Sequence, residues 1–296
     1  MIDIKDETFN GSYPFRPNYL EIGGFKMHYV DEGEGEPVVM LHGDPTWGYL
    51  WRKFIPSVSD THRVIVPDHM GMGKSSVPKN PNPYLLRHHI SNLEELLLSL
   101  KLKEITLVLH DWGGPVGMGF AVRHPGLIKR LVLTHTWAFA EWPGGKFPRL
   151  LEIIRSERGE SFVLEKNGYV KRALLGTANY PENYTSKVLN AYLSPFPTPE
   201  SRLALLCWSR DISVSESDRS YGEMNHIEDK LSLLADIPVL LIWDMLDPVL
   251  PGSVLEKWQA IYPHAKVCKI EDASHFLQED APGRVICEIN HFLSSK

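Results

Sequence analysis

The sequence predicts an α/β fold in which a mostly parallel sheet is flanked by helices and carries an inserted helical cap. Short runs rich in Val, Ile and Leu alternate with longer helix-like segments, which is typical of strands joined by crossover helices. This alternation stops between about residues 137 and 235 and then resumes. Because the chain has 296 residues and 43% of them are hydrophobic, it can bury a sizeable core.

The first half of the chain is expected to supply four strands and two helices. The strands cover residues 25–30, 37–41, 63–66 and 105–109. Leu93, Leu96, Leu97 and Leu100 share one face of the first helix. The second helix spans about residues 115–123, directly after the fourth strand.

After residue 123, the alternation of strands and helices continues only near residue 130 and again from about residue 238. Further strands are expected at residues 130–133, 238–243 and 266–270, and an amphipathic helix at about 282–293. The stretch between them is rich in aromatic residues and proline. We therefore assign residues 1–136 and 236–296 to a main domain and residues 137–235 to a cap domain.

Composition argues against several classes of function. The net charge is −6 and no run of five or more basic residues is present, so nucleic-acid binding is not expected. The acidic start is not followed by an apolar segment, and no membrane-spanning run is found. The three cysteines are far apart and lack the spacing of a zinc site. We expect a cytoplasmic protein, monomeric or weakly homo-oligomeric, with no metal or cofactor.

The segment Leu109-His-Asp-Trp-Gly-Gly114 places Asp111 where a strand turns into a helix. A serine at such an elbow needs a base to remove its proton, whereas a carboxylate attacks as an ion. An aspartate here could instead cap the helix, which contributes roughly 1 kcal/mol. Leu109 is bulkier than the small residue usual two positions before the nucleophile, but Gly113 and Gly114 preserve the far side of the elbow. We interpret Asp111 as a nucleophile.

Two later strand-end loops carry the residues that would assist it. His275 follows the last strand, and histidine is the side chain best suited to activate water near neutral pH. Asp247 follows the preceding strand and could orient the imidazole. Asp244 competes for this role, but it lies too near the strand end to project over the site. The order of nucleophile, acid and histidine along the chain is that of an α/β-hydrolase.

A third loop, His42-Gly-Asp-Pro-Thr-Trp47, follows an early strand. It could present backbone N–H groups beside the nucleophile, as an oxyanion hole requires. Taken together, this loop, Pro67-Asp-His-Met-Gly-Met-Gly-Lys-Ser75 and His110-Asp-Trp-Gly-Gly114 resemble the haloalkane dehalogenase family of α/β-hydrolases. The β-lactone decarboxylases of long-chain olefin synthesis are nearly as similar. The resemblance is dense over about residues 20–140 and 236–295, and patchy in the cap, as at residues 191–197.

The resemblance implies that Asp111 is the nucleophile, His275 the base and Asp247 its orienting acid. It also implies that the indole N–H of Trp112, a donor with no acceptor function, binds the leaving halide. Where the family commonly has Asn or Glu, this chain has Asp44, which cannot donate while ionised. Two nearby carboxylates raise the pKa of at least one. Asp44 could therefore be protonated, turned outward, or active through its backbone N–H alone.

A second donor to the leaving group would then come from the cap. Some dehalogenases use a cap tryptophan, for which the candidates are Trp137, Trp142 and Trp208. The cap also offers Tyr180, Tyr184 and Tyr192, and pairs of cap tyrosines are what epoxide hydrolases use to protonate a leaving alkoxide.

The leading hypothesis is hydrolytic dehalogenation of haloalkanes through an aspartyl alkyl ester, which water then hydrolyses to an alcohol. The partners would be a small apolar substrate, water and the released halide. The alternatives are alkene-forming β-lactone decarboxylation, epoxide hydrolysis and, in a different class, a non-catalytic ligand-binding relative. A serine esterase is disfavoured because position 111 is not serine.

Overall fold

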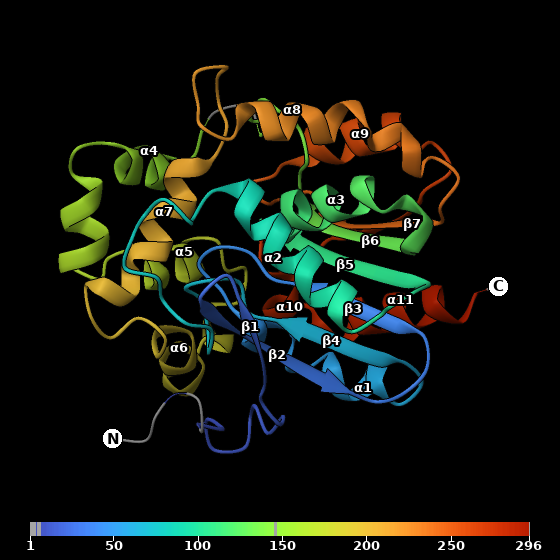
Figure 1. Ribbon diagram of the computed structural model, residues 1–296, viewed down its shortest axis with the longest axis horizontal. Coiled ribbons are helices and arrows are strands. Elements are labelled where there is room, and N and C mark those ends of the chain that lie inside the picture. The colour runs from blue at the N-terminus through green and yellow to red at the C-terminus, as the bar shows by residue number, and fades with distance from the viewer. Residues whose placement is uncertain (1–3, 5–6, 145–146, 296) are drawn as a thin grey trace.

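The computed structural model describes residue 4 and residues 7–144 and 147–295, so parts of the predicted main domain (1–3, 5–6, 296) and cap (145–146) lie outside the described residues (Figure 1). Its centre is an eight-stranded sheet in the order β1-β2-β4-β3-β5-β6-β7-β8. The strands are β1 (Asn18–Ile22), β2 (Phe25–Glu32), β3 (Pro37–Leu41), β4 (Arg63–Pro67), β5 (Ile105–Asp111), β6 (Ile128–Thr136), β7 (Val239–Asp244) and β8 (Lys266–Ile270).

The predicted α/β fold class is confirmed by the pairing of these strands. β3 to β8 are parallel to one another, whereas β1 pairs with β2, and β2 with β4, in antiparallel fashion. The edge strand β1 was not predicted, because its first four residues alternate between partly and more exposed positions and only its last, Ile22, is buried. β3 and β5 are buried along their whole length, which explains why their sequences are continuous apolar runs instead of alternating ones.

Helices cover both faces of the sheet, as predicted. Figure 1 shows α2 (Leu86–Ser99), α3 (Gly113–Arg123) and α9 (Gly252–Ile261) along one face. The other face carries α1 (Ile55–Ser59) and α11 (Pro282–Ser294). In α2, Leu93, Leu96 and Leu97 are buried and Leu100 is partly buried, so the predicted apolar face lies against the sheet.

The segment between β6 and β7 is helical. It contains α4 (Arg149–Arg155), a π-helix (Ser161–Glu165), α5 (Val170–Gly176), α6 (Ser186–Leu193), α7 (Leu203–Asp211) and α8 (Tyr221–Asp229). Figure 1 shows α4 to α7 beyond one end of the sheet, while α8 lies beside α3 and α9. The division into domains at residues 137 and 235 stays a prediction. None of the described helices is both long and apolar enough to cross a bilayer.

A buried ion pair ties this helical segment to the sheet. Arg52 Nη2 donates to Glu279 Oε2 at 2.8 Å, and Tyr192 of α6 donates its hydroxyl to Glu279 Oε1 at 2.6 Å. Glu279 lies in α10 (Leu277–Asp280), the short helix that follows His275. The network thus connects the loop after β3, the segment over the sheet and the loop of His275.

Candidate active site

Asp111 ends β5 in a sharp elbow. Its φ angle is +49°, in the left-handed region that a non-glycine residue rarely adopts. Glycine is required around it because a Cβ at Gly43 would overlap the Asp111 carboxylate, and a Cβ at Gly113 would overlap the carbonyl oxygen of Leu41. The sequence departure at Leu109 does not prevent the elbow: the Leu109 side chain packs against Gly117 of α3, where only a glycine leaves room for it.

The Asp111 carboxylate is held between two loops. Oδ1 accepts a hydrogen bond from the backbone N–H of Asp44 at 2.9 Å, and Oδ2 lies 3.6 Å from His275 Nε2. The parallel register explains the first contact, because Leu41 at the end of β3 pairs with Leu109 of β5. The loop after β3 therefore leaves the sheet beside the elbow, as predicted from its sequence.

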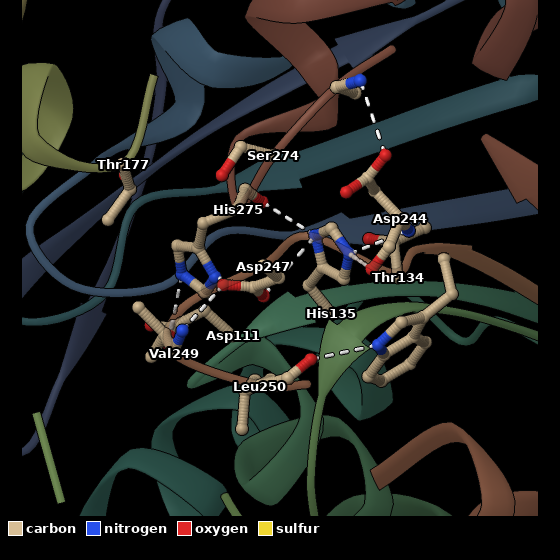
Figure 2. Close-up of polar contacts among 12 residues, drawn as sticks. Asp111, Thr134, His135, Thr177, Asp244, Asp247, Val249, Leu250, Ser274 and His275 are labelled. Carbon is tan, nitrogen blue, oxygen red and sulfur yellow. Dashed lines mark hydrogen bonds and ion pairs between the residues drawn. The ribbon is translucent and has the colours of Figure 1, made fainter. Parts of the chain in front are cut away.

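His275 is oriented by Asp247 and not by Asp244. His275 Nδ1 lies 2.9 Å from Asp247 Oδ2, while Asp247 Oδ1 accepts the backbone N–H of Val249 at 2.7 Å. Asp244 instead accepts the backbone N–H groups of Leu246 and Ala273. Figure 2 shows His275 between Asp111 and Asp247, with Asp244 on the far side of His135. The structure thus brings together the three residues predicted from separate loops.

The contacts between His275 and Asp247 determine the protonation states of both residues. Burial alone would lower the pKa of His275, but the charges of Asp247 and Asp111 and their hydrogen bonds raise it to about 10. Burial would raise the pKa of Asp247, but His275 and His135 hold it below its ordinary value. The site therefore carries an imidazolium against Asp111 at neutral pH.

Two buried histidines that sequence reasoning did not single out hold His275 from behind. His110 Nε2 and His135 Nδ1 each donate to the backbone carbonyl of His275 at 2.9 Å. His135 Nε2 accepts the backbone N–H of Asp244 at 2.9 Å, which assigns the proton to Nδ1. Burial lowers the pKa of both imidazoles, so both stay neutral. The sequence signal that could have identified His135 is its place at the end of β6, because that strand end pairs with the end of β5 beside Asp111.

The ligand atoms of His135, Asp247 and His275 lie within 4.8 Å of one another, a spacing that a metal ion could also use. In this structure the same atoms are engaged in hydrogen bonds to one another or to the backbone. The hydrogen bonds of these three residues thus fix the orientation of the His275 imidazole.

Asp44 faces inward, so the outward turn considered from the sequence is wrong. Asp44 Oδ2 accepts hydrogen bonds from the Tyr169 hydroxyl at 2.7 Å and the Ser209 hydroxyl at 2.9 Å. Burial raises the pKa of Asp44 well above its ordinary value, and the charge of Asp111 adds to this effect against the two hydrogen bonds. The sequence offered no signal for Tyr169 and Ser209, which come from the helical segment.

An apolar cavity of about 420 Å³ opens above Asp111, a size that suits a small organic molecule. Its polar lining comes from both sides of the site. The lining includes Asp44, Asp111, Trp112, Trp137, Trp142, Arg149, Tyr169, Arg172, Thr177 and His275. The indole N–H groups of Trp137 and Trp142 are buried and have no hydrogen-bond partner in the described part of the chain.

The other cap residues proposed from the sequence do not line this cavity. Trp208 packs its ring against His89, with centroids 3.9 Å apart. Tyr180, Tyr184 and Tyr192 are also outside the cavity lining, and the Tyr192 hydroxyl is bound to Glu279. These candidate tyrosines therefore do not lie at the cavity, and α6 turns the Tyr192 hydroxyl toward α10. Tyr169 is the tyrosine at the site.

Comparison with known proteins places the chain. Residues 36–282 match the family described as the alpha/beta hydrolase fold. A cis-3-alkyl-4-alkyloxetan-2-one decarboxylase of Shewanella oneidensis is 39% identical, over 95% of this chain and 89% of that protein. A haloalkane dehalogenase of Sphingobium indicum is 30% identical, over 96% of this chain and 97% of that protein.

Among solved structures, the haloalkane dehalogenase DatA from Agrobacterium tumefaciens C58 superposes with a TM-score of 0.86 at 25% identity, covering 94% of this chain and 96% of that chain. An oxetan-2-one is a β-lactone, so the similar proteins fall into the two groups that the motifs indicate. The chain belongs to the α/β-hydrolase fold family and is similar to its haloalkane dehalogenases and to decarboxylases of β-lactones.

Proposed function

We propose that this protein converts disubstituted β-lactones into an alkene and carbon dioxide, with Asp111 as the nucleophile. The similar decarboxylase is 39% identical to this chain, whereas the similar haloalkane dehalogenase is 30% identical. Dehalogenation, the leading hypothesis from the motifs alone, therefore becomes the second candidate function.

The observation that carries this proposal is the carboxyl group of Asp44, the residue whose backbone N–H contacts Asp111. A halide ion is commonly bound by N–H donors, but the loop after β3 supplies the carboxyl group of Asp44, whose Oδ2 accepts from the hydroxyl groups of Tyr169 and Ser209 of the helical segment. A carboxyl group on the cavity wall is better suited to an oxygen leaving group. The ring oxygen of a lactone is such a group.

In the first step, the Asp111 carboxylate attacks the ring carbon that bears the ring oxygen. The bond from this β-carbon to the ring oxygen breaks, and the oxygen keeps the electron pair as a carboxylate that stays attached to the α-carbon. The product is an ester of Asp111 that carries a free carboxylate. The apolar cavity assists this step because an ion bound away from water is a stronger nucleophile.

In the second step, the bond between the α-carbon and its carboxylate breaks and carbon dioxide leaves. The electron pair forms the double bond, and the bond from the β-carbon to Asp111 breaks, which restores the carboxylate. No water is consumed. Inversion in the first step and anti elimination in the second convert a cis lactone into a cis alkene.

His275 then acts as a fixed cation. Its pKa is raised to about 10 by Asp247 and Asp111 against the effect of burial, so the imidazolium faces Asp111 from 3.6 Å at neutral pH. It stabilises the carboxylate that Asp111 becomes again when the ester collapses.

The test is product analysis with a cis-3,4-dialkyl β-lactone. The expected products are the cis alkene and carbon dioxide, with neither formed by an Asp111→Ala variant. A β-hydroxy acid as the main product would show that water opens the ring, and an unchanged lactone would remove the proposal.

Hydrolytic dehalogenation is the second candidate, favoured by one specific observation. The indole N–H groups of Trp137 and Trp142 are unpartnered and line the same cavity as Trp112. Either could join Trp112 around a halide. Once Asp111 is an ester, it no longer raises the pKa of His275, which could then lose its proton and activate water against the ester. Bromide release from 1-bromobutane and 1,2-dibromoethane, compared with Asp111→Ala, tests it. Equal release by both proteins would exclude it.

A further inference from the structure

We infer that Asp44 carries a proton on Oδ1 and donates it in a hydrogen bond to the oxygen that leaves the substrate, which makes Asp44 a catalytic residue selective for carboxylate leaving groups. The choice of leaving group rests on the proposed function. The protonation of Asp44 does not, because it follows from the contacts of the free protein.

The hydrogen bonds of Asp44 match those of a neutral carboxylic acid. Oδ2 accepts from both Tyr169 and Ser209, which uses the two lone pairs of a carbonyl oxygen. Oδ1 is buried and has no partner among the described residues. A buried carboxylate oxygen left without a donor is costly, whereas an O–H group at this position needs only an acceptor. Oδ1 itself has almost no exposed surface, but Asp44 lines the cavity, and the acceptor that we propose is an oxygen of a substrate bound there.

The charges around Asp44 favour the same state. Asp111 is the nearest charged group, because the backbone N–H of Asp44 itself contacts the Asp111 carboxylate at 2.9 Å. Tyr169 is a neutral donor, since burial raises the pKa of its hydroxyl well above the ordinary value. His275 also lines the cavity and is already paired with Asp247 and Asp111, while Arg149 and Arg172 line it without forming an ion pair with Asp44 in the described structure. Two adjacent anions would repel each other in this apolar space, so one carboxyl keeps its proton.

The chemistry follows from these positions. When the β-carbon to oxygen bond breaks, negative charge develops on the ring oxygen within the cavity that Asp44 lines. An O–H donor to a developing carboxylate forms a charge-assisted hydrogen bond, which is about twice as strong as a neutral one. The proton stays on Asp44 and the ring oxygen leaves as the carboxylate, so the balance of the reaction is unchanged. An ionised Asp44 would repel the same leaving group.

The pH dependence has a defined sign. Asp44 is active when protonated, so while Asp111 is ionised the rate should be constant below the raised pKa of Asp44 and should fall as the pH rises through it. Asn at this position is neutral at every pH and, with its oxygen toward Tyr169 and Ser209, keeps an N–H donor at the Oδ1 position. The rate of Asp44→Asn should therefore not fall in this pH range. It should fall only where His275, with its pKa of about 10, loses its proton.

The experiment has two arms. In the first, the protein labelled with carbon-13 at its aspartate carboxyl groups is titrated by NMR, and the Asp44 signal is identified by its loss in Asp44→Asn. A protonated carboxyl at neutral pH is expected, and a carboxylate there overturns the inference. This arm uses no substrate, so a failed β-lactone assay leaves its result intact.

In the second arm, alkene formation from the cis β-lactone is measured against pH for wild type, Asp44→Asn and Asp44→Ala. Asp44→Asn should stay within about tenfold of wild type, while Asp44→Ala should lose about a hundredfold or more in kcat, as when an oxyanion donor is removed. Asp60→Asn, an exposed aspartate, is the matched control and should not change the profile. An identical pH profile in Asp44→Asn and wild type, or full activity in a folded Asp44→Ala, would overturn the catalytic role.

Discussion

The backbone N–H of Asp44 donates to Oδ1 of Asp111 at 2.9 Å, so the residue that places a carboxyl group on the wall of the cavity also anchors the predicted nucleophile. The backbone contact and the side chain of Asp44 can be separated by mutation, because a substitution changes only the second. This makes position 44 the point at which the two candidate reactions can be distinguished.

Above the raised pKa of Asp44, Asp44→Asn should release halide from bromoalkanes faster than wild type. There the wild-type carboxyl group has lost its proton, whereas the amide is still an N–H donor, and a hydrogen bond to a charged group is worth about 1.5–3 kcal/mol, or roughly tenfold or more in rate. Bromide release from 1-bromobutane measures the change. No gain in a variant that still consumes β-lactone would mean that position 44 does not contact the leaving group.

His275→Ala should separate the two reactions by mass. With a bromoalkane, the ester of Asp111 should accumulate, because no base activates water, and the intact protein should gain the mass of the alkyl group. With a β-lactone, the ester collapses without water, so alkene formation should slow without a stable adduct. An unmodified protein after bromoalkane treatment would argue against an ester on Asp111, and a stable lactone adduct would argue against collapse without water.

His135→Phe should lower kcat with little change in KM. The variant removes one of the two donors to the His275 carbonyl and leaves the Asp244 N–H without an acceptor, which should also cost about 1–3 kcal/mol of stability. Steady-state kinetics and urea unfolding measure both effects. His264→Phe, at an exposed histidine, is the control. Unchanged kcat would show that His110 alone is enough to hold His275.

Arg52→Met should destabilise the fold, because it leaves the buried Glu279 carboxylate paired only with the partly exposed Lys53, whose Nζ lies 2.9 Å from Oε2. Loss of one partner of a buried ion pair costs up to about 3–5 kcal/mol in the free energy of unfolding. Arg63→Met is the matched control, since Arg63 pairs with Asp31 through side chains that are 31% and 23% exposed. There the expected loss is about 0–1 kcal/mol. Equal losses in the two variants in urea unfolding would contradict a structural role for the Glu279 network.

Short motifs made the catalytic half of the site predictable. Asp111, Asp247 and His275 each follow a strand whose apolar run is legible in the sequence, and parallel strands bring their carboxyl ends to one edge of the sheet. Asp247, preferred over Asp244 from position alone, is the residue that lies 2.9 Å from His275 Nδ1, whereas Asp244 at the strand end bonds to nearby backbone.

The cap-side half of the site was not predictable in the same way. Tyr169 and Ser209 contact Asp44 across 125 and 165 residues of chain, and no local pattern specifies which face of α5 or α7 lies over the loop after β3. The tyrosines of α6 and of the segment before it are candidates by residue type alone, but none lines the cavity, and the packing of α6 turns the Tyr192 hydroxyl toward Glu279. Helix orientation is decided by burial over the whole segment, which a list of residue types does not contain.

The central claim is that an ester forms on Asp111 and collapses to an alkene without water. It can be tested by turnover of a cis-3,4-dialkyl β-lactone in water enriched in the heavy oxygen isotope, followed by mass analysis of the peptide that contains Asp111. Water that hydrolyses an aspartyl ester leaves one of its oxygens on the aspartate. The account predicts that alkene accumulates while Asp111 stays unlabelled, and heavy oxygen in the Asp111 carboxylate would contradict it.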